Sequence, residues 1–159
     1  MSRYGSREES LGRWISVIHR YGQSFIEKKC ADLDIGYGHV AFILTLNRKG
    51  GLSQEKLSEI LSIDKTTTAR AIKKLIELGY ILRSPDSLDK RIQHLHLTAK
   101  SNDIIPYITQ SLRTWTKVLS KGFTEDERRL IIGFLKRMAE NALVFREDGF
   151  VQRKGFRQC

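Results

Sequence analysis

Cysteine and proline are both scarce in this chain of 159 residues, which contains two of each. Two cysteines, Cys30 and Cys159, are too few for the disulfide framework of a small secreted domain. Long apolar runs are also missing: the longest, residues 40–46, is interrupted by a threonine and is far too short to span a bilayer. Residues 1–10 are polar and charged, so we expect no signal peptide. These absences lead us to expect a protein of the reducing cytoplasm.

Motifs typical of enzymes are absent as well. The chain has no glycine-rich phosphate loop, no cluster of metal ligands and no nucleophile paired with a base. We therefore expect no catalytic residue, no cofactor and no metal. His94 and His96 share one face of a predicted strand, but two ligands do not make a zinc site. A lone helical cysteine such as Cys30 is usually inert packing, but a redox role stays open, because the neighbouring cations Lys28 and Lys29 would activate a partly exposed thiolate.

Acidic residues are outnumbered, with 18 Asp and Glu against 28 Lys and Arg, for a net charge of +10 and a pI near 9.8. Such a balance favours a polyanionic partner. Residues 47–100 carry 11 basic and 6 acidic side chains, but residues 101–159 carry 11 and 7, so charge alone does not locate the binding surface. With 40% hydrophobic residues, the chain can bury the core of one domain with an added oligomerisation layer.

Residues 53–61 and 64–79 predict two short helices. Ser53 and Asp64 are suitable N-caps, because their side-chain oxygens can accept N–H groups of the first turn. The link Ser62-Ile63 is long enough only to cross the helices steeply, as in a helix-turn-helix. Apolar or small residues at helical spacing form a stripe on each helix. The stripe comprises Leu57, Ile60 and Leu61 in the first helix, and Ala69, Ile72, Leu75, Ile76 and Gly79 in the second.

The opposite face of the second helix suits the major groove of a DNA duplex. Arginine and lysine can pair with guanine edges, and threonine can reach a base, a thymine methyl or a phosphate. A plain solvated face has a similar composition, so this helix alone does not decide between the two interpretations. The candidates for base contacts are Thr66, Thr67 and Arg70, and the candidates for phosphate contacts are Lys65, Lys73 and Lys74.

The segment that follows predicts a β-hairpin with a charged tip. Residues 80–83 and 93–97 have strand character, and Leu52 is expected to add a brief third strand. The polar loop between the strands carries Lys90 and Arg91 at its far side. A basic loop beside a recognition-type helix makes a winged helix, whose wing can place an arginine in the electronegative minor groove. We expect Arg91 to make that contact, with Lys90 beside it.

Five motifs stand in a fixed order between residues 53 and 98. They are Asp64-Lys65-Thr66-Thr67, Arg70, Leu75-x-x-x-Gly79-Tyr80-Ile81, Asp89-x-Arg91 and Leu95-x-Leu97-Thr98. In this order they resemble the MarR family of transcription regulators, and the layout extends over nearly the whole chain. The resemblance implies that Asp89 holds Arg91 in pose. Two departures, Ser87-Leu88 at the wing tip and Ser101 where many members have glycine, concern wing conformation more than function.

Long amphipathic helices are expected on both sides of this region. They are predicted over residues 8–32, 98–121 and 124–146, with Thr98 as a possible cap of the second of these. A shorter helix is expected over residues 39–47, which are apolar almost all round and therefore central. Proline cannot donate a backbone hydrogen bond, so Pro106 predicts a kink or break. Thr124 and Glu127 have the spacing of a capping box.

The wide apolar stripes of the outer helices need a partner, which is either the rest of the same chain or a second chain. Because these stripes are wider than a small winged-helix lobe can cover, we expect burial against a second chain. Pairing would set two recognition helices about one duplex turn (roughly 34 Å) apart on a palindromic site. We accordingly expect a mainly α fold in four parts: an N-terminal dimerisation helix (residues 1–35), a winged helix-turn-helix lobe (36–98), C-terminal dimerisation helices (99–146) and a mobile basic tail (147–159).

The resemblance further implies a homodimeric, double-stranded DNA-binding transcription regulator on a pseudo-palindromic operator. Most such proteins repress, and many release DNA on binding a small aromatic or phenolic anion between the dimer layer and the reading lobe. Here the candidate cleft residues are His19, Arg20, Tyr37 and Tyr107, which could equally be core or surface residues with no ligand. The alternative function is a non-specific architectural or RNA-binding winged helix without a ligand switch.

Overall fold

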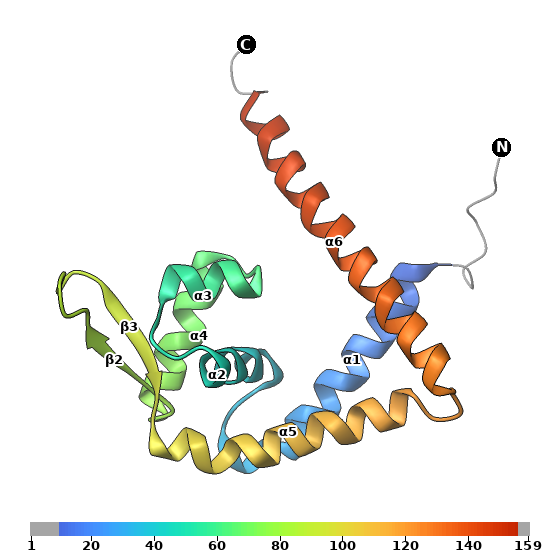
Figure 1. Ribbon diagram of the computed structural model, residues 1–159, viewed down its shortest axis with the longest axis horizontal. Coiled ribbons are helices and arrows are strands. Elements are labelled where there is room, and N and C mark those ends of the chain that lie inside the picture. Colours follow the sequence, from blue (N-terminus) through green and yellow to red (C-terminus); the bar gives the residue numbers. More distant parts are fainter. Residues whose placement is uncertain (1–9, 156–159) are drawn as a thin grey trace. The chain divides into compact units, whose positions relative to one another are not determined.

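The computed structural model describes residues 10–155, and the side chains of residues 10–145. This part of the chain is mainly helical, with one three-stranded antiparallel sheet (Figure 1). The chain divides after Thr116 into two compact units. None of the described helices combines the length and apolar character that a bilayer span requires. The elements are α1 (Leu11–Lys29), η1 (Ala31–Leu33), α2 (Tyr37–Arg48), β1 (Leu52–Ser53), α3 (Gln54–Leu61), α4 (Lys65–Glu77), β2 (Ile81–Pro85), β3 (Gln93–Leu97), α5 (Ala99–Leu119) and α6 (Glu125–Gly155).

Helix α1 begins after Ser10, whose hydroxyl accepts a backbone N–H of the first turn, and ends at Lys29. Our prediction placed the end of this helix at residue 32, three residues beyond its end at Lys29. The predicted start, at residues 8 and 9, lies outside the described part. The 3-10 turn η1 and the left-handed conformation of Asp34, with φ of 53°, redirect the chain toward α2. A local hydrogen-bonding change of this kind has no signature in hydrophobic spacing.

Helix α2 begins at Tyr37, two residues before its expected start at His39. The His39 Nδ1 accepts the backbone N–H of Gly36 at 3.1 Å and so caps the helix. Burial lowers the pKa of His39, and the charge of Lys74 lowers it further, which favours the neutral ring that this cap requires. The helix is central, as expected, and buries Val40, Phe42, Ile43 and Leu46.

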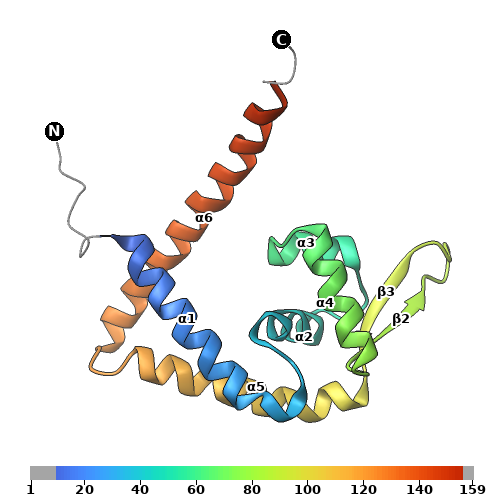
Figure 2. The same cartoon turned by 180° about the vertical axis from the view of Figure 1, so that it is seen from behind.

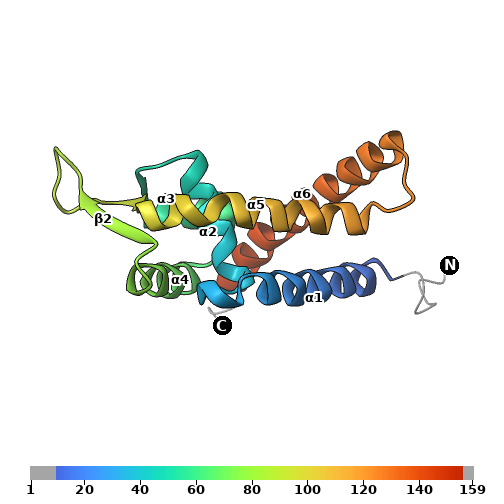
Figure 3. The same cartoon turned by 90° about the horizontal axis from the view of Figure 1, so that it is seen from below.

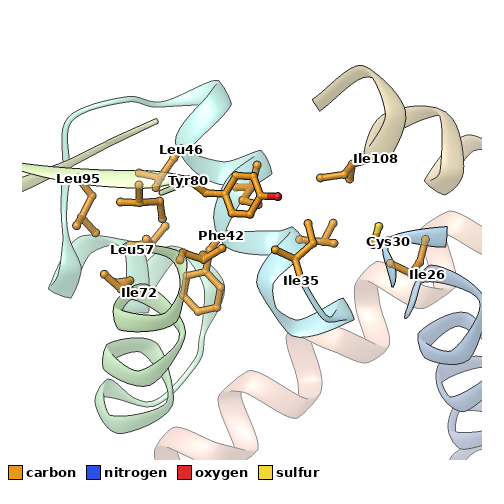
Figure 4. Packing of buried hydrophobic residues seen from close by; sticks show 14 residues of the cluster. Ile26, Cys30, Ile35, Phe42, Leu46, Leu57, Ile72, Tyr80, Leu95 and Ile108 are labelled. Carbon is orange, nitrogen blue, oxygen red and sulfur yellow. The ribbon is translucent and has the colours of Figure 1, made fainter. Parts of the chain in front are cut away.

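The hydrophobic core lies in the first unit, where helices and sheet meet (Figure 4). Leu57 of α3 and Ile72 of α4 are fully buried and fasten the two short helices to it. Ile60 on α3 was expected to be buried too, but its side chain is 40% exposed, because it lies beside the buried face rather than on it. The core comprises Ile26, Cys30, Ile35, Val40, Phe42, Ile43, Leu46, Leu57, Ile72, Leu75, Tyr80, Ile81, Leu95 and Ile108.

The sheet has the strand order β1-β3-β2, with both pairings antiparallel. Leu52 in β1 pairs with Leu95 in β3, which confirms the brief strand expected at Leu52. In the hairpin, Ile81 pairs with Leu97 and Ser84 with His94. This register turns Leu95 into the core and leaves the far end of the hairpin in solvent.

Hydroxyl groups at the start of α5 fasten it to the connection between α4 and β2. Thr98 donates its hydroxyl to the Gly79 carbonyl at 2.7 Å, so its side chain ties α5 to the end of α4 and does not cap α5 as expected. Ser101 is fully buried and donates to the carbonyl of Tyr80. The Tyr80 hydroxyl in turn donates to the Leu33 carbonyl at 2.9 Å. The serine that departs from the usual glycine thus adds a hydrogen bond at this junction.

Helices α1 and α5 make close contact in the first unit. The Trp115 ring stacks on Phe25 with centroids 5.6 Å apart, and its Nε1 lies 3.0 Å from the place where a Cβ on Gly22 would stand. We expected either a kink or a break at Pro106, and the break is absent because helix α5 is continuous through this residue. Pro106 is exposed, and water can hydrate the carbonyl at Asn102 that loses its helical donor.

The second unit contains the end of α5 and helix α6. The capping box at Thr124 is confirmed: its backbone N–H donates to the Glu127 carboxylate at 2.7 Å, and its hydroxyl accepts the N–H of Glu127. Helix α6 continues to Gly155, beyond the expected boundary at residue 146, and residues 156–159 lie outside the described part. Its large apolar side chains are exposed within the chain, among them Leu130, Ile131, Ile132, Phe134 and Leu135.

Candidate DNA interface

The turn between α3 and α4 is built from short-range hydrogen bonds. Ser62 takes the left-handed conformation, with φ of 54°, and Ser58 donates its hydroxyl to the Ile63 carbonyl. The Asp64 carboxylate then accepts the N–H of Thr67 at 2.8 Å, which lowers the pKa of Asp64. Both predicted N-caps, Ser53 and Asp64, are confirmed. These contacts fix the crossing of the two helices in the helix-turn-helix.

Helix α4 packs beside α2 and α3 (Figure 2). One face of α4 is buried and the other is exposed. Thr68, Ile72 and Leu75 are buried on the inner face. Thr68 was not expected there, and its hydroxyl finds no hydrogen-bond partner in the described structure. The outer face carries the predicted base-contact residues Thr66, Thr67 and Arg70, all exposed. The sequence therefore presents two hydroxyls and a guanidinium on one turn and a half of helix.

The lysines of α4 are held by acidic neighbours. Lys65 lies 2.7 Å from Glu55 of α3, and this hydrogen bond raises the pKa of Lys65. Lys74 lies 3.2 Å from Asp34, and Lys73 lies 3.9 Å from Glu77. Among the predicted DNA-contacting cations, Arg70, Lys90 and Arg91 make no ion pair within residues 10–145, so these three need no exchange of partners to bind an external polyanion.

The hairpin β2–β3 forms a wing that extends beyond helices α3 and α4 (Figure 3). At its tip, the Asp89 carboxylate accepts the backbone N–H of Arg91 at 2.9 Å. The carbonyl of Asp89 accepts the N–H of Ile92, also at 2.9 Å. Asp89 therefore fixes the backbone on which Arg91 stands and leaves the guanidinium itself exposed.

The base of the wing is tied by an acid–histidine pair that the sequence reasoning missed. His94 Nε2 lies 2.8 Å from the Asp86 carboxylate, and His94 Nδ1 lies 2.8 Å from the Gly51 carbonyl. Hydrogen bonds from the N–H of Leu88, from His94 and from the N–H of Asp89 lower the pKa of Asp86 to about 2. The available signal was the hairpin register, which brings the acidic residue after Pro85 close to the histidine of β3.

A pocket of about 370 Å³ lies between the wing and the start of α3. Arg83 and Arg91 line one side, and Gln54 accepts a hydrogen bond from the Arg83 guanidinium at 3.2 Å. Glu55, which lines the other side, is occupied by Lys65. The two arginines make the wing side of this pocket electropositive.

Comparison with known proteins identifies the family. A model of the MarR family matches residues 38–93. The chain is 35% identical over 129 residues to the uncharacterized HTH-type transcriptional regulator YybA of Bacillus subtilis, covering 81% of this chain and 86% of that one. The chain belongs to the MarR family. Its members are DNA-binding transcription regulators and not enzymes.

Two solved structures support the MarR assignment at the level of fold. A MarR transcriptional regulator from Methanosarcina mazei is 40% identical, with a TM-score of 0.77, and the match covers 85% of this chain and 97% of that one. A MarR family regulator from Listeria monocytogenes, solved in complex with a 26mer DNA, is 30% identical with a TM-score of 0.82, covering 95% and 99%. The expected winged helix-turn-helix fold is confirmed.

The four candidate effector residues of this MarR protein are only partly brought together. His19 of α1 and Tyr37 of α2 meet edge to face, with ring centroids 5.6 Å apart. The Tyr107 hydroxyl donates to the Lys29 carbonyl at 2.7 Å, and Arg20 is exposed. Within residues 10–145, neither Tyr107 nor Arg20 makes a hydrogen bond, ion pair or ring contact with the His19–Tyr37 pair.

The hypothesis that Cys30 senses oxidants is wrong. Its side chain is fully buried in the core, and burial raises the pKa of the thiol. A protonated, enclosed thiol has neither the thiolate character nor the access that oxidation requires. The alternative use of His94 and His96 as metal ligands also loses its support, because both ring nitrogens of His94 are already engaged by protein atoms.

Proposed function

We propose that this MarR family chain is a sequence-specific transcription regulator that binds double-stranded DNA as a homodimer on a pseudo-palindromic operator. The observation that carries the proposal is the exposed face of α4 beside a wing whose Arg91 has no acidic partner in the described structure. In this arrangement α4 lies in the major groove and the wing reaches the adjacent minor groove. A relative from Listeria monocytogenes was solved in complex with a 26mer DNA, which supports DNA binding by a chain of this fold.

The proposed contacts divide by chemistry. Thr66, Thr67 and Arg70 read base edges, because hydroxyls and a guanidinium match groove donors and acceptors. Arg91 enters the minor groove with its backbone fixed by Asp89, and Lys90 lies beside it. The α4 lysines bind phosphates, and each must exchange an internal carboxylate for the DNA backbone. These are Lys65, Lys73 and Lys74.

The homodimer is supported by apolar surface at both ends of the chain. On α1, Leu11, Trp14, Ile15, Ile18 and Tyr21 are each between 45% and 68% exposed. Helix α6 carries a comparable exposed set, described above. Surfaces of this extent on a folded chain mark an interface. Residues 1–35 and 99–146 would form the dimerisation layer and residues 36–98 the reading lobe, with the protein located in the cytoplasm beside its DNA.

We further propose that the regulator represses and that a small aromatic anion releases it. The support is the ring pair of His19 and Tyr37 at the junction of α1 with the reading lobe, with Arg20 as the cation. A ligand bound there would favour one spacing of the two reading helices over another, and so change operator affinity.

Competition binding tests the proposal against a non-specific architectural or RNA-binding role. The purified protein is titrated with a fluorescent duplex that carries an inverted repeat from the promoter region of its own gene, at fixed salt. Retention of tight binding in excess random DNA supports a regulator, whereas equal affinity for random duplex or RNA contradicts it. The logarithm of affinity should fall against the logarithm of salt with a slope of about 0.9 for each phosphate neutralised.

A further inference from the structure

His94 stands at the middle of the wing base, and both of its ring nitrogens face hydrogen-bond acceptors. Nδ1 lies 2.8 Å from the carbonyl oxygen of Gly51, in the turn before β1. Nε2 lies 2.8 Å from Oδ2 of Asp86, in the loop after β2. The ring is mostly covered, with 28% of the side chain exposed, and the Asp86 side chain is covered to the same degree.

These two partners determine the protonation state of the ring. A carbonyl oxygen has no proton to give, and the Asp86 carboxyl, with its pKa of about 2, has none near neutral pH. A neutral imidazole has one N–H and can donate to only one of the two acceptors. Its unprotonated nitrogen would then face the other acceptor oxygen with no proton between them, and the two lone pairs would repel. Only the imidazolium, with an N–H on each nitrogen, satisfies both.

We propose that doubly protonated His94 is a positioning residue for DNA binding, because it fastens the wing loop to the turn before β1 and so fixes the pose of Arg91. This inference rests on the proposed function, since it assigns a role within DNA binding by the wing. His94 itself contacts protein groups only.

The link from His94 to Arg91 is a chain of hydrogen bonds. Asp86 Oδ1 accepts the N–H of Leu88 at 2.8 Å and the N–H of Asp89 at 3.1 Å, while its Oδ2 holds the His94 ring. The Asp89 carboxylate then accepts the N–H of Arg91. These bonds and the N–H of Asp86, which donates to the Ile92 carbonyl at 2.9 Å, hold the loop together internally. Release of His94 therefore removes the tie between this loop and the turn before β1, and the loop that carries Asp89 and Arg91 can then shift as a unit.

The same contacts make the clamp sensitive to pH. Four groups from neighbouring elements face His94: Asp86 from the loop, Ser84 from β2, and Ser53 and the Gly51 carbonyl from the β1 side. On its own strand, β3, the other histidine is His96, two residues further along. Among these, Asp86 is the charged group that acts on the ring: its hydrogen bond, followed by that of Gly51, raises the pKa of His94.

The sign of the effect follows from the direction of that shift. A raised pKa means that the clamp is complete at a pH below the ordinary histidine value and is lost as the pH rises through the raised pKa of His94. Asp86 stays ionised over this whole interval, because its pKa is about 2. The wing should therefore bind DNA more weakly on the alkaline side of neutrality.

The protonation state is tested first in the free, full-length protein, by NMR of the 15N-labelled imidazole rings. The wild type and His96→Gln are titrated from about pH 5 to about pH 9, around the ordinary histidine pKa. We expect the His94 ring to carry a proton on both nitrogens at neutral pH and to titrate above the ordinary value. A His94 ring that is neutral at pH 6.5, or that titrates at or below that value, overturns the proposal whatever the protein binds.

The role in DNA binding is then tested by measuring operator affinity at about pH 6 and pH 8.5 at one ionic strength, on either side of the ordinary histidine pKa. Wild type and the matched control His96→Gln should lose affinity as the pH rises. His94→Gln should bind weakly at both pH values with no such slope, and Asp86→Asn should move the midpoint of the loss to lower pH. A His94→Gln slope equal to that of wild type overturns the role.

The two readouts separate the inference from the function on which it rests. Absence of specific DNA binding at every pH contradicts the proposed function, while the NMR titration still decides whether the clamp exists. Circular dichroism and gel filtration of each variant show whether it is folded. If His94→Gln does not fold, the shift of the binding midpoint in Asp86→Asn decides the outcome: a shift to lower pH supports the role and an unchanged midpoint overturns it.

Discussion

Arg91 combines a fixed backbone with a free charge. Its N–H is held by Asp89, and its guanidinium is exposed on a wing that extends into solvent. An arginine placed in this way loses little conformational freedom of the main chain when it enters a groove. The individual side chain, more than the total charge of +10, should therefore determine how tightly the wing binds.

Arg91→Ala should weaken operator binding by roughly 1–3 kcal/mol, the usual value of a groove contact. Fluorescence anisotropy at fixed salt measures the change. Arg113→Ala, which removes an exposed arginine from α5, is the matched control and should change affinity far less. Equal losses in the two variants would mean that only net charge matters.

Thr68 is buried on the inner face of α4, with a hydroxyl that lacks a partner in the described structure. Thr68→Val keeps the β-branched shape and removes the unpartnered group, so we expect the free energy of unfolding to rise by about 1 kcal/mol. Urea denaturation measures it. Thr67→Val, on the exposed face, should bring no gain, and a loss of stability in Thr68→Val would contradict the assignment.

At the level of elements, most helices could be predicted from the spacing of hydrophobic residues and from the capping residues. The caps at Ser53, Asp64 and Thr124 are where the sequence placed them, because short-range hydrogen bonds determine them. Of the stripe expected on α4, Ile72 and Leu75 are buried as the helical period predicts, whereas Gly79 is exposed and the buried Thr68 was missed. The course of α5 through Pro106 was not predictable, since it depends on whether solvent reaches the carbonyl that the proline leaves unpaired.

The wing base was missed for a related reason. Asp86 and His94 are eight positions apart, and only the strand register brings their side chains to 2.8 Å. The DNA-facing residues could be proposed from their chemistry and order alone, because they all lie on one helix and one loop. The pairing of α4 lysines with Glu55 and Asp34 required the tertiary fold.

Helix α3 offers an internal comparison of buried and exposed apolar residues. Leu57→Ala should lower the free energy of unfolding by roughly 2–5 kcal/mol, because the side chain is fully enclosed between α4 and the rest of the core. Ile60→Ala on the same helix should cost much less, because that side chain is 40% exposed. Urea denaturation at a fixed protein concentration measures both, and similar costs would contradict the packing described for α3.

At the scale of the whole molecule, α1 and α6 each expose a stripe of apolar side chains that a single chain does not bury. Each stripe would be costly to hold in water, and each lies outside the reading lobe. Association of two chains would bury them and double the number of DNA contacts. Operator affinity and self-association should therefore vary together.

Ile18→Glu should weaken the dimer, because it sets a carboxylate within the apolar stripe of α1. Analytical ultracentrifugation across a range of concentrations should find dimer for wild type and for Ser16→Glu, which adds the same charge at an exposed polar position of α1. Ile18→Glu should shift toward monomer and lose operator binding in parallel. A monomeric wild type, or an unaffected Ile18→Glu dimer, would contradict this role of α1.

Gly22 gives the α1–α5 contact an unusual sensitivity to the smallest possible substitution. A methyl group there would stand 3.0 Å from the indole nitrogen of Trp115, so alanine would require the ring, or the helix that carries it, to move by a few tenths of an ångström. If α1 and α5 form the dimer interface, that movement would change the distance between the two recognition helices, and so the spacing of the operator half-sites that the dimer fits. Inherited variation at this one position could therefore retune gene control without altering a single atom that touches DNA.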